Sequence, residues 1–394
     1  MTGIEASEKK RNRRRGRKSG EKSTLGKDVD FGNPQDHNSI LIKFDEEAST
    51  WYEYGKNLPG RNSTIYSDPI QTMHQSNNDL VSKYRALGDS IYQKEIHLVG
   101  KNTTRDSDNR WVENTMRKGT LKDRIAATSV TVSSDPLHKF YALDGLLSMA
   151  GCAESGGKTN SRVAQLSAEA LEDVFTNTLL PPDRKLLTLA HRPLYLFETN
   201  KNGKKSKKTL SPRILLLWRF EEMVKEKYDL FLRKYMAHTL KEGVEMHKIA
   251  TLHSAGALLV SVPEGESQLL AMIVNKLGDP GKKTAAAAGH QLRLILQKHP
   301  NMQMVIAREV QQLTHRPHLS SKALYNCIVF LNQLKLEKED GTPSQSKHAD
   351  NLPSSLIKTY FRLFEVAIKS NKRGSKDKDS EEKGAKSRLL SALL

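Results

Sequence analysis

The apolar positions of this chain recur at helical spacing from residue 80 onward. Leu80, Tyr84, Leu87 and Ile91 follow one another in steps of three or four, which is typical of an amphipathic helix. From Trp111 the same periodicity continues almost without interruption, and strand-like alternation is nearly absent. The pattern therefore predicts an all-α fold. We expect helices at residues 80–98, 120–132, 136–150, 161–178, 183–191, 212–241, 244–260, 265–277, 280–298, 302–314, 319–336 and 354–370.

Side-chain acceptors followed by proline mark several of the expected helix starts. Asp135-Pro136, Ser211-Pro212 and Asp279-Pro280 each place an acceptor at the N-cap and proline at the first helical position, where its missing N–H costs nothing. Thr120 and Asp123 have the spacing of a capping box. These signals predict where helices begin and carry no information about catalysis.

The predicted helices between residues 244 and 336 come in short pairs. Each pair takes roughly 35 to 45 residues, the period of HEAT and armadillo units. One pair cannot bury its apolar face alone, whereas stacked pairs share a continuous core. We therefore expect a HEAT/armadillo-like α-solenoid of stacked helix pairs, preceded by a disordered basic arm.

Composition divides the chain into five expected parts. Residues 1–75 read as the disordered arm, with short docking segments at Ile40–Ile42 and at Trp51-Tyr52. The remaining parts are a helix and linker at 76–110, the helical repeat domain at 111–368, a charged linker at 369–388 and the start of a second helical half at 389–394.

The charge of the chain indicates a polyanionic partner. Its 394 residues hold 63 Lys and Arg against 45 Asp and Glu, a formal net charge of +18, and release of counterions from phosphates would drive binding. The candidate nuclear-import signal or RNA-contacting arm consists of Lys9, Lys10, Arg11, Arg13, Arg14, Arg15, Arg17 and Lys18. Further candidates for RNA contact are Lys204, Lys205, Lys207 and Lys208 in a basic loop, and Lys276, Lys282 and Lys283 around a helix start whose dipole favours phosphate. The alternative, that these lysines only solvate the surface, stays open.

The motifs that would indicate an enzyme are missing or malformed. Gly151 to Thr159 resembles a phosphate-binding loop, but five residues separate Gly151 from Gly157 where four are needed, and the preceding segment reads as a helix. We expect a glycine-rich turn there. The 13 histidines show no metal-ligand spacing, and Cys152 and Cys327 stand 175 residues apart. We therefore expect no cofactor, no metal and no catalytic activity.

The aromatic and long apolar segments read as structural. Trp218 and Phe220, and likewise Tyr360, Phe361 and Phe364, fall at helical spacing and are expected to anchor the core.

No stretch approaches the 18 consecutive apolar residues of a membrane-spanning helix, so no membrane partner is expected. The two distant cysteines imply no disulfide framework and favour a reducing compartment.

A series of short strings occurs in a definite order along the chain. The strings are Gly119–Arg124, Asp135–His138, Leu179–Lys185, His191–Pro193, Val274–Pro280, Lys298–Met302, Ser320–Ala323, Phe330–Gln333, Tyr360–Phe361 and Leu389–Leu394. Together they resemble the CCAAT-binding factor family, and most closely its zeta-type branch of nucleolar complex proteins. The resemblance spans about residues 111 to 394. It implies that the chain corresponds to the N-terminal half of the family's length and stops where a second helical half begins.

The resemblance also implies a function. Proteins of this branch are helical-repeat scaffolds of the nucleus and nucleolus that assemble the large ribosomal subunit and take part in rRNA processing. They bind pre-ribosomal RNA, a second nucleolar complex protein and other large-subunit assembly factors. The alternative is a CCAAT-box-associated transcription regulator. That role would need a recognition helix in the major groove, and the sequence offers no helix-turn-helix, zipper or zinc module.

Overall fold

The helical prediction is confirmed by the computed structural model. It describes residues 39–42, 50–56, 78–103, 107–153, 160–197, 210–317, 319–336, 352–372 and 380–393. Within these ranges every regular element is a helix and no strand occurs.

The helices begin and end as follows. The first set is α1 (Trp51–Lys56), α2 (Asn78–Thr103), α3 (Ser107–Lys118), α4 (Leu121–Ser134), α5 (Tyr141–Met149), α6 (Ser161–Val174), α7 (Pro212–Leu230) and α8 (Ala237–Glu242). The second set is α9 (Glu245–Ser261), α10 (Glu266–Asn275), α11 (Lys282–Lys298), α12 (Gln303–Thr314), α13 (Ser321–Leu331), α14 (Leu352–Lys372) and α15 (Ser380–Leu393). Short turns of other helix types are η1 (Phe175–Leu179), η2 (Leu189–His191), η3 (Leu194–Phe197), η4 (Phe231–Met236), η5 (Lys276–Gly278) and η6 (Pro300–Met302).

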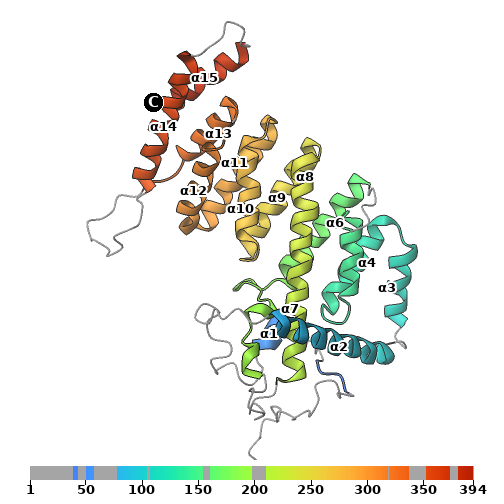
Figure 1. Cartoon of the computed structure of the whole chain (residues 1–394). Coiled ribbons are helices and arrows are strands. Elements are labelled where there is room, and N and C mark those ends of the chain that lie inside the picture. The colour runs from blue at the N-terminus through green and yellow to red at the C-terminus, as the bar shows by residue number, and fades with distance from the viewer. Residues whose placement is uncertain are drawn as a thin grey trace, which may run out of the picture.

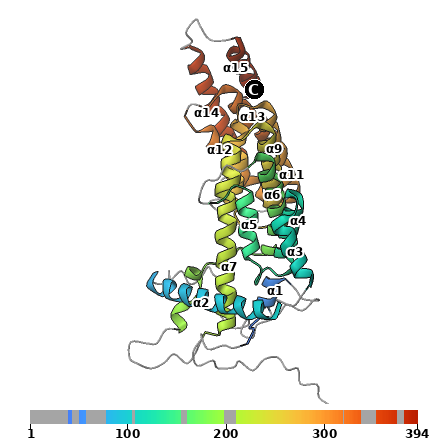
Figure 2. The same ribbon diagram turned by 90° about the vertical axis from the view of Figure 1, so that its right-hand side faces the viewer.

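The C-terminal part of the molecule is a stack of two helical layers. Helices α6, α9, α11, α13 and α15 contact one another in that order in one layer, while α10, α12 and α14 follow one another in the second (Figures 1 and 2). The apolar side chains between the layers form a hydrophobic cluster that extends from the N-terminal segments to α14.

A single long helix joins this stack to the N-terminal helices. Helix α7, the π-helical turn η4 and helix α8 run without a break from Pro212 to Glu242, and α2 crosses α7 near its N-terminal end (Figure 2). Helix α7 buries residues on every side, among them Trp218 and Phe220, which confirms their expected place in the core. Because α7 is buried on every side, it must be surrounded by other elements, and its buried residues include the charged Arg219, Glu221 and Glu222 as well as apolar ones.

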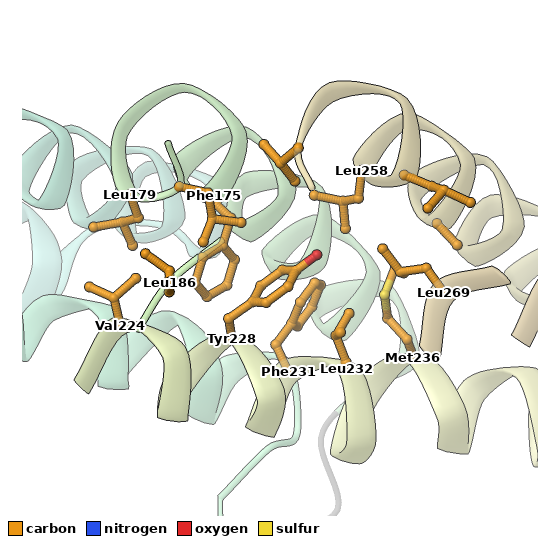
Figure 3. Close-up of a cluster of buried hydrophobic side chains, with 14 of the residues drawn as sticks. Phe175, Leu179, Leu186, Val224, Tyr228, Phe231, Leu232, Met236, Leu258 and Leu269 are labelled. Atoms are coloured by element: carbon orange, nitrogen blue, oxygen red, sulfur yellow. The ribbon is translucent and has the colours of Figure 1, made fainter. Parts of the chain in front are cut away.

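Aromatic rings fill the space between α6 and α7 (Figure 3). The ring of Phe175 packs edge-on to Tyr228 with centroids 5.0 Å apart and stacks on Phe231 at 5.7 Å. Phe175 begins η1 and Phe231 begins η4, both π-helical turns. The extra residue in such a turn widens it locally, and here the two widened turns face each other across this cluster.

Two of the predicted helix starts are correct. Thr120 is the N-cap of α4, and its hydroxyl accepts a hydrogen bond from the N–H of Asp123. Ser211 is the N-cap of α7, with Pro212 in the first turn, although its side chain does not accept the expected capping hydrogen bond.

The other two predicted starts are displaced because the acidic side chain caps a turn instead of the helix. Asp135 accepts from the N–H of His138, and helix α5 begins only at Tyr141. Asp279 accepts from the N–H of Gly281, and α11 begins at Lys282.

Several predicted boundaries are wrong. Residues 183–191 are not a helix, since only Leu189–His191 forms a 3-10 turn. Parts of the expected charged linker at 369–388 are helical, because α14 extends to Lys372 and α15 begins at Ser380. The helix predicted at 80–98 is longer, since α2 runs from Asn78 to Thr103, and α3 begins at Ser107 within the expected helix and linker at 76–110.

Candidate interaction site

The basic residues expected to contact RNA fall into two groups. The arm from Lys9 to Lys18 and the loop from Lys204 to Lys208 lie outside the residues that the structure describes. Lys276, Lys282 and Lys283 are described and lie around the start of α11. Lys282 and Lys283 are exposed, and Nζ of Lys283 stands 4.0 Å from a carboxylate oxygen of Glu245.

Lys276 is engaged by an internal carboxylate. Its Nζ donates to Oδ2 of Asp279 at 2.9 Å, and Nζ of Lys248 lies 3.6 Å from the same oxygen. Burial opposes ionisation of Asp279, but the hydrogen bonds from Lys276 and from the Gly281 N–H outweigh it and lower the pKa of this carboxyl. A phosphate that bound Lys276 would therefore have to compete with the carboxylate of Asp279.

Two adjacent buried glutamates on α7 organise a charge network. Glu221 accepts from Nη2 of Arg192 at 2.7 Å, with both side chains buried, and from Nη1 of Arg184. The same carboxylate accepts from the backbone N–H of Leu187 at 2.9 Å. Each oxygen of Glu221 thus binds a guanidinium, and one of them also binds a backbone amide.

Glu222 plays the same part on the neighbouring face of α7. It accepts from Nη2 of Arg85 at 2.8 Å, from Nη1 of Arg219 at 3.0 Å and from the N–H of Leu189 at 3.3 Å. Burial acts to raise the pKa of Glu222, but the hydrogen bond and charge of Arg85 and the charge of Arg219 lower it overall. Arg219 also donates to Asp89 at 2.6 Å, which joins α2 to the network.

A third carboxylate completes the support of the segment between η1 and η2. Glu264 accepts from the backbone N–H of Leu186 at 2.7 Å and from Nζ of Lys225 at 2.8 Å. Buried backbone amides outside helices need such partners. Since each of these glutamates is bound by a cation and by an amide, the arrangement is that of a structural network, not of a general acid–base pair.

A second buried centre holds the residues near the N-terminus. Glu95 of α2 is fully buried and accepts from the backbone N–H groups of Leu41 at 2.8 Å and Ile42 at 3.0 Å. Nε2 of His138 lies 3.6 Å from Glu95, and its Nδ1 lies 2.8 Å from Oδ2 of Asp135. Burial disfavours the charged imidazole, but the hydrogen bond to Asp135 and the nearby carboxylate of Glu95 raise the pKa of His138 to about 9.

The two short segments near the N-terminus are part of the core. Ile42 and Trp51 are buried, and the indole N–H of Trp51 donates to the carbonyl of Leu179 at 3.0 Å. Arg213 of α7 donates to the carbonyl of Leu41 at 2.8 Å. Segments far apart in the sequence are thereby fixed to α2 and α7.

Sequence reasoning missed the buried acidic residues. It singled out no aspartate or glutamate as a site residue, whereas Glu95, Glu221, Glu222 and Glu264 are all buried. One signal was available, because Glu221 and Glu222 directly follow the apolar run that begins at Leu215. Phe361 is the opposite case: it was expected in the core but is 69% exposed.

The described residues offer little reactive chemistry. Among them, no three His, Cys, Asp or Glu side chains are grouped to hold a metal ion. Cys152 and Cys327 are free and buried, and burial raises the pKa of both thiols to about 12. In the part of the chain that the structure describes, no helix combines the length and apolar character needed to cross a membrane.

Comparison with known proteins finds clear relatives. The chain is 33% identical over 319 residues to human CCAAT/enhancer-binding protein zeta, a match that covers 80% of this chain and 27% of the relative. It is 32% identical over 335 residues to nucleolar complex protein 1 of Drosophila melanogaster, covering 84% and 26%. It is 27% identical over 324 residues to ribosome biogenesis protein NOC1 of Chaetomium thermophilum, covering 78% and 30%. No family model matches the chain.

The chain spans about a quarter to a third of the length of these relatives. The similarity therefore concerns one region of much longer proteins. Two of the ordered strings that carry the family resemblance, Leu179–Lys185 and His191–Pro193, lie in or beside the segment held by the buried glutamates.

Proposed function

Because this chain belongs to the family of CCAAT/enhancer-binding protein zeta and nucleolar complex protein 1, we propose that it is a nucleolar scaffold for assembly of the large ribosomal subunit. In this role it binds pre-ribosomal RNA, a partner nucleolar complex protein and other assembly factors, and it catalyses no reaction. The observation that carries the proposal is the similarity over 78% of the chain to a relative named as a ribosome biogenesis protein.

The helical stack suits this role as an α-solenoid of the HEAT/armadillo type. Between α9 and α13, helices of each layer contact the next helix of their own layer as well as helices of the other layer. That contact pattern is the one that stacked helix pairs produce. A solenoid presents long surfaces on which several partners can bind side by side, which is what an assembly scaffold requires.

The basic segments supply the RNA-binding part of the proposal. Eight of the ten residues from Lys9 to Lys18 are basic, and Lys204, Lys205, Lys207 and Lys208 follow one another in a second cluster. Such runs bind phosphates with little sequence preference and also serve nuclear import. The exposed Lys282 and Lys283 extend the same surface property to the start of α11.

Co-purification from nuclei tests the proposal. The tagged chain is isolated at low salt from nuclei of its own organism, and the RNA and proteins bound to it are identified. Precursor RNA of the large subunit together with nucleolar assembly factors is the expected result. Recovery of promoter DNA with transcription factors would overturn it in favour of a CCAAT-box-associated regulator, the role to which the human relative's name refers.

A further inference from the structure

A groove runs along the outer side of the first helical layer. It has a volume of about 880 Å³ and is formed by α6, α9 and α11. Helix α9 forms its floor, where Ala250, His253 and Ala257 succeed one another at helical spacing. The floor extends from Met246 to Ser261, which at 1.5 Å per residue gives about 22 Å, or four turns of helix.

The groove is apolar where a partner would enter it. Met246 is 70% exposed and Leu294, on the wall formed by α11, is 37% exposed. The alanines of the floor leave room for close approach, because the distance between packed helices depends on the side chains at their contact. The dimensions and the small floor residues fit an added α-helix.

The wall formed by α6 is acidic. Glu169 and Glu172 both line the groove, three residues apart on one face of α6. Within the described residues, neither carboxylate forms an ion pair with a lysine or arginine. Burial raises the pKa of Glu172, and the charges of Glu169 and Asp173 add to this, although a hydrogen bond with Ser254 and the charge of His253 act to lower it. Carboxylates repel phosphates, so this wall disfavours RNA although the whole chain carries a charge of +18.

We propose that this groove binds an amphipathic α-helix of a protein partner, with its apolar face on α9 and lysine or arginine side chains toward Glu169 and Glu172. Lys298 lies on the opposite wall, so the basic flank must face α6. Helix-in-groove binding of this kind takes its affinity from apolar anchors and its orientation from the charged flanks. The inference rests on the proposed scaffold role, since it supplies one surface through which a scaffold holds a protein.

Fluorescence anisotropy with a labelled model helix tests the groove on the full chain. The probe is a peptide of about 16 residues, one per position of the floor at helical rise, with leucine on one face and lysine on the other. The same peptide with glutamate in place of lysine is the comparison. We expect the lysine peptide to bind the parent chain saturably, although the net charge of +18 repels it from the rest of the surface. The double variant Glu169→Lys, Glu172→Lys should bind the lysine peptide at least tenfold more weakly.

The matched control changes the same amount of charge outside the groove. Glu242→Lys on α8 combined with Glu309→Lys on α12 should leave binding of the lysine peptide within about twofold of the parent chain. A second groove variant, Ala257→Trp, fills the floor without altering charge and should also abolish binding. Equal binding by the parent and both groove variants, or displacement of the lysine peptide by the glutamate peptide, would overturn the proposal.

The same variants separate this inference from the proposed function. Removal of Glu169 and Glu172 takes negative charge from the surface, so RNA affinity should be unchanged or higher. A chain that bound no RNA but still bound the lysine peptide would refute the ribosomal role and leave the groove intact.

Discussion

At the scale of single residues, buried carboxylates replace the hydrogen-bond partners that a regular helix would provide. Glu95, Glu221, Glu222 and Glu264 each accept from at least one backbone N–H of a segment without α-helical structure. An apolar substitute would leave those amides and the neighbouring cations unsatisfied, and loss of one partner from a buried charged pair is strongly destabilising.

The substitution Glu221→Leu tests this at its centre. It removes the partner of Arg192, whose side chain is 6% exposed, and of the Leu187 amide. We expect the free energy of unfolding to fall by about 3–5 kcal/mol. Urea denaturation, monitored by circular dichroism, measures this change. The control Glu242→Leu, at an exposed position of α8, should change it by no more than about 0.5 kcal/mol. A similar small loss for Glu221→Leu would contradict a structural role for the network.

His138 should make stability depend on pH in the alkaline range. Its pKa in the folded chain is raised to about 9 from the ordinary value of 6.5, so the stabilisation by its charge is complete below about pH 6.5. It is lost as the pH rises through 9. The full effect is of the order of 3 kcal/mol.

Thermal unfolding of the parent and of His138→Gln between pH 6 and 10 measures this effect. The gap between the two melting temperatures should be largest at pH 6 and should close toward pH 10. A gap that stays constant across this range would show that the imidazole is neutral in the folded chain.

Side chains also show where sequence reasoning reaches its limit. The placement of Trp218 and Phe220 in the core was correct, because an apolar run within a helix can only be buried. Helix α14 carries two apolar stripes, one with Leu356 and Leu363 and one with Ile357 and Phe361. Periodicity alone does not decide which stripe faces the molecule, and Phe361 belongs to the exposed one.

At the scale of elements, the segment between η1 and η2 shows why residues 183–191 were wrongly predicted as a helix. Its leucines have helical spacing, but Pro181 and Pro182 precede them, and carboxylates of α7 and the Glu264 side chain bind its amides instead of helical carbonyls. Tertiary partners of this kind are encoded far away in the sequence. The long helices of the C-terminal stack were predicted well because their apolar faces follow one period over many residues.

The crossing of α2 over α7 depends on Gly88. A Cβ atom at this position would lie 3.0 Å from Cβ of Arg219, closer than side chains normally pack. We expect Gly88→Val to lower the free energy of unfolding by about 1–3 kcal/mol through overpacking, measured by urea denaturation.

Gly100 provides the matched control on the same helix. A Cβ atom there would meet nothing within 4 Å, so Gly100→Ala should raise stability by roughly 0.5–1 kcal/mol through helix propensity alone. Equal effects of the two substitutions would show that α2 does not approach α7 this closely.

At the scale of the whole molecule, the helical class and the order of the helices in the stack follow from the sequence. The attachment of the N-terminal segments does not. Ile42 joins the core through Glu95, and Trp51 joins it through the carbonyl of Leu179. The spacing of apolar residues along the chain does not predict contacts between residues so far apart in the sequence. The same applies to the groove with the acidic α6 wall, because its two walls come from α6 and α11, on either side of α9.

RNA binding by the whole chain should be strongly dependent on salt. If the chain neutralises six or more phosphates, its affinity for RNA should fall by roughly 10³-fold between 50 and 200 mM salt. Deletion of residues 1–28 combined with replacement of Lys204, Lys205, Lys207 and Lys208 by glutamine should make the dependence much shallower. Fluorescence anisotropy with labelled RNA of several sequences measures the salt dependence of the parent chain and of the variant. An affinity of the parent chain that does not change with salt would contradict binding through phosphate contacts.

The unbroken helix from Pro212 to Glu242 makes the molecule sensitive to residue count. It is about 46 Å long at 1.5 Å per residue. Its N-terminal part contacts α2 and its C-terminal end leads into the helical stack, so it fixes the rotation of one part relative to the other. One residue more or less in its α-helical part turns one end by about 100° relative to the other. Single-residue insertions and deletions here should therefore be tolerated far less than substitutions, unless a widened turn such as η4 absorbs the extra residue.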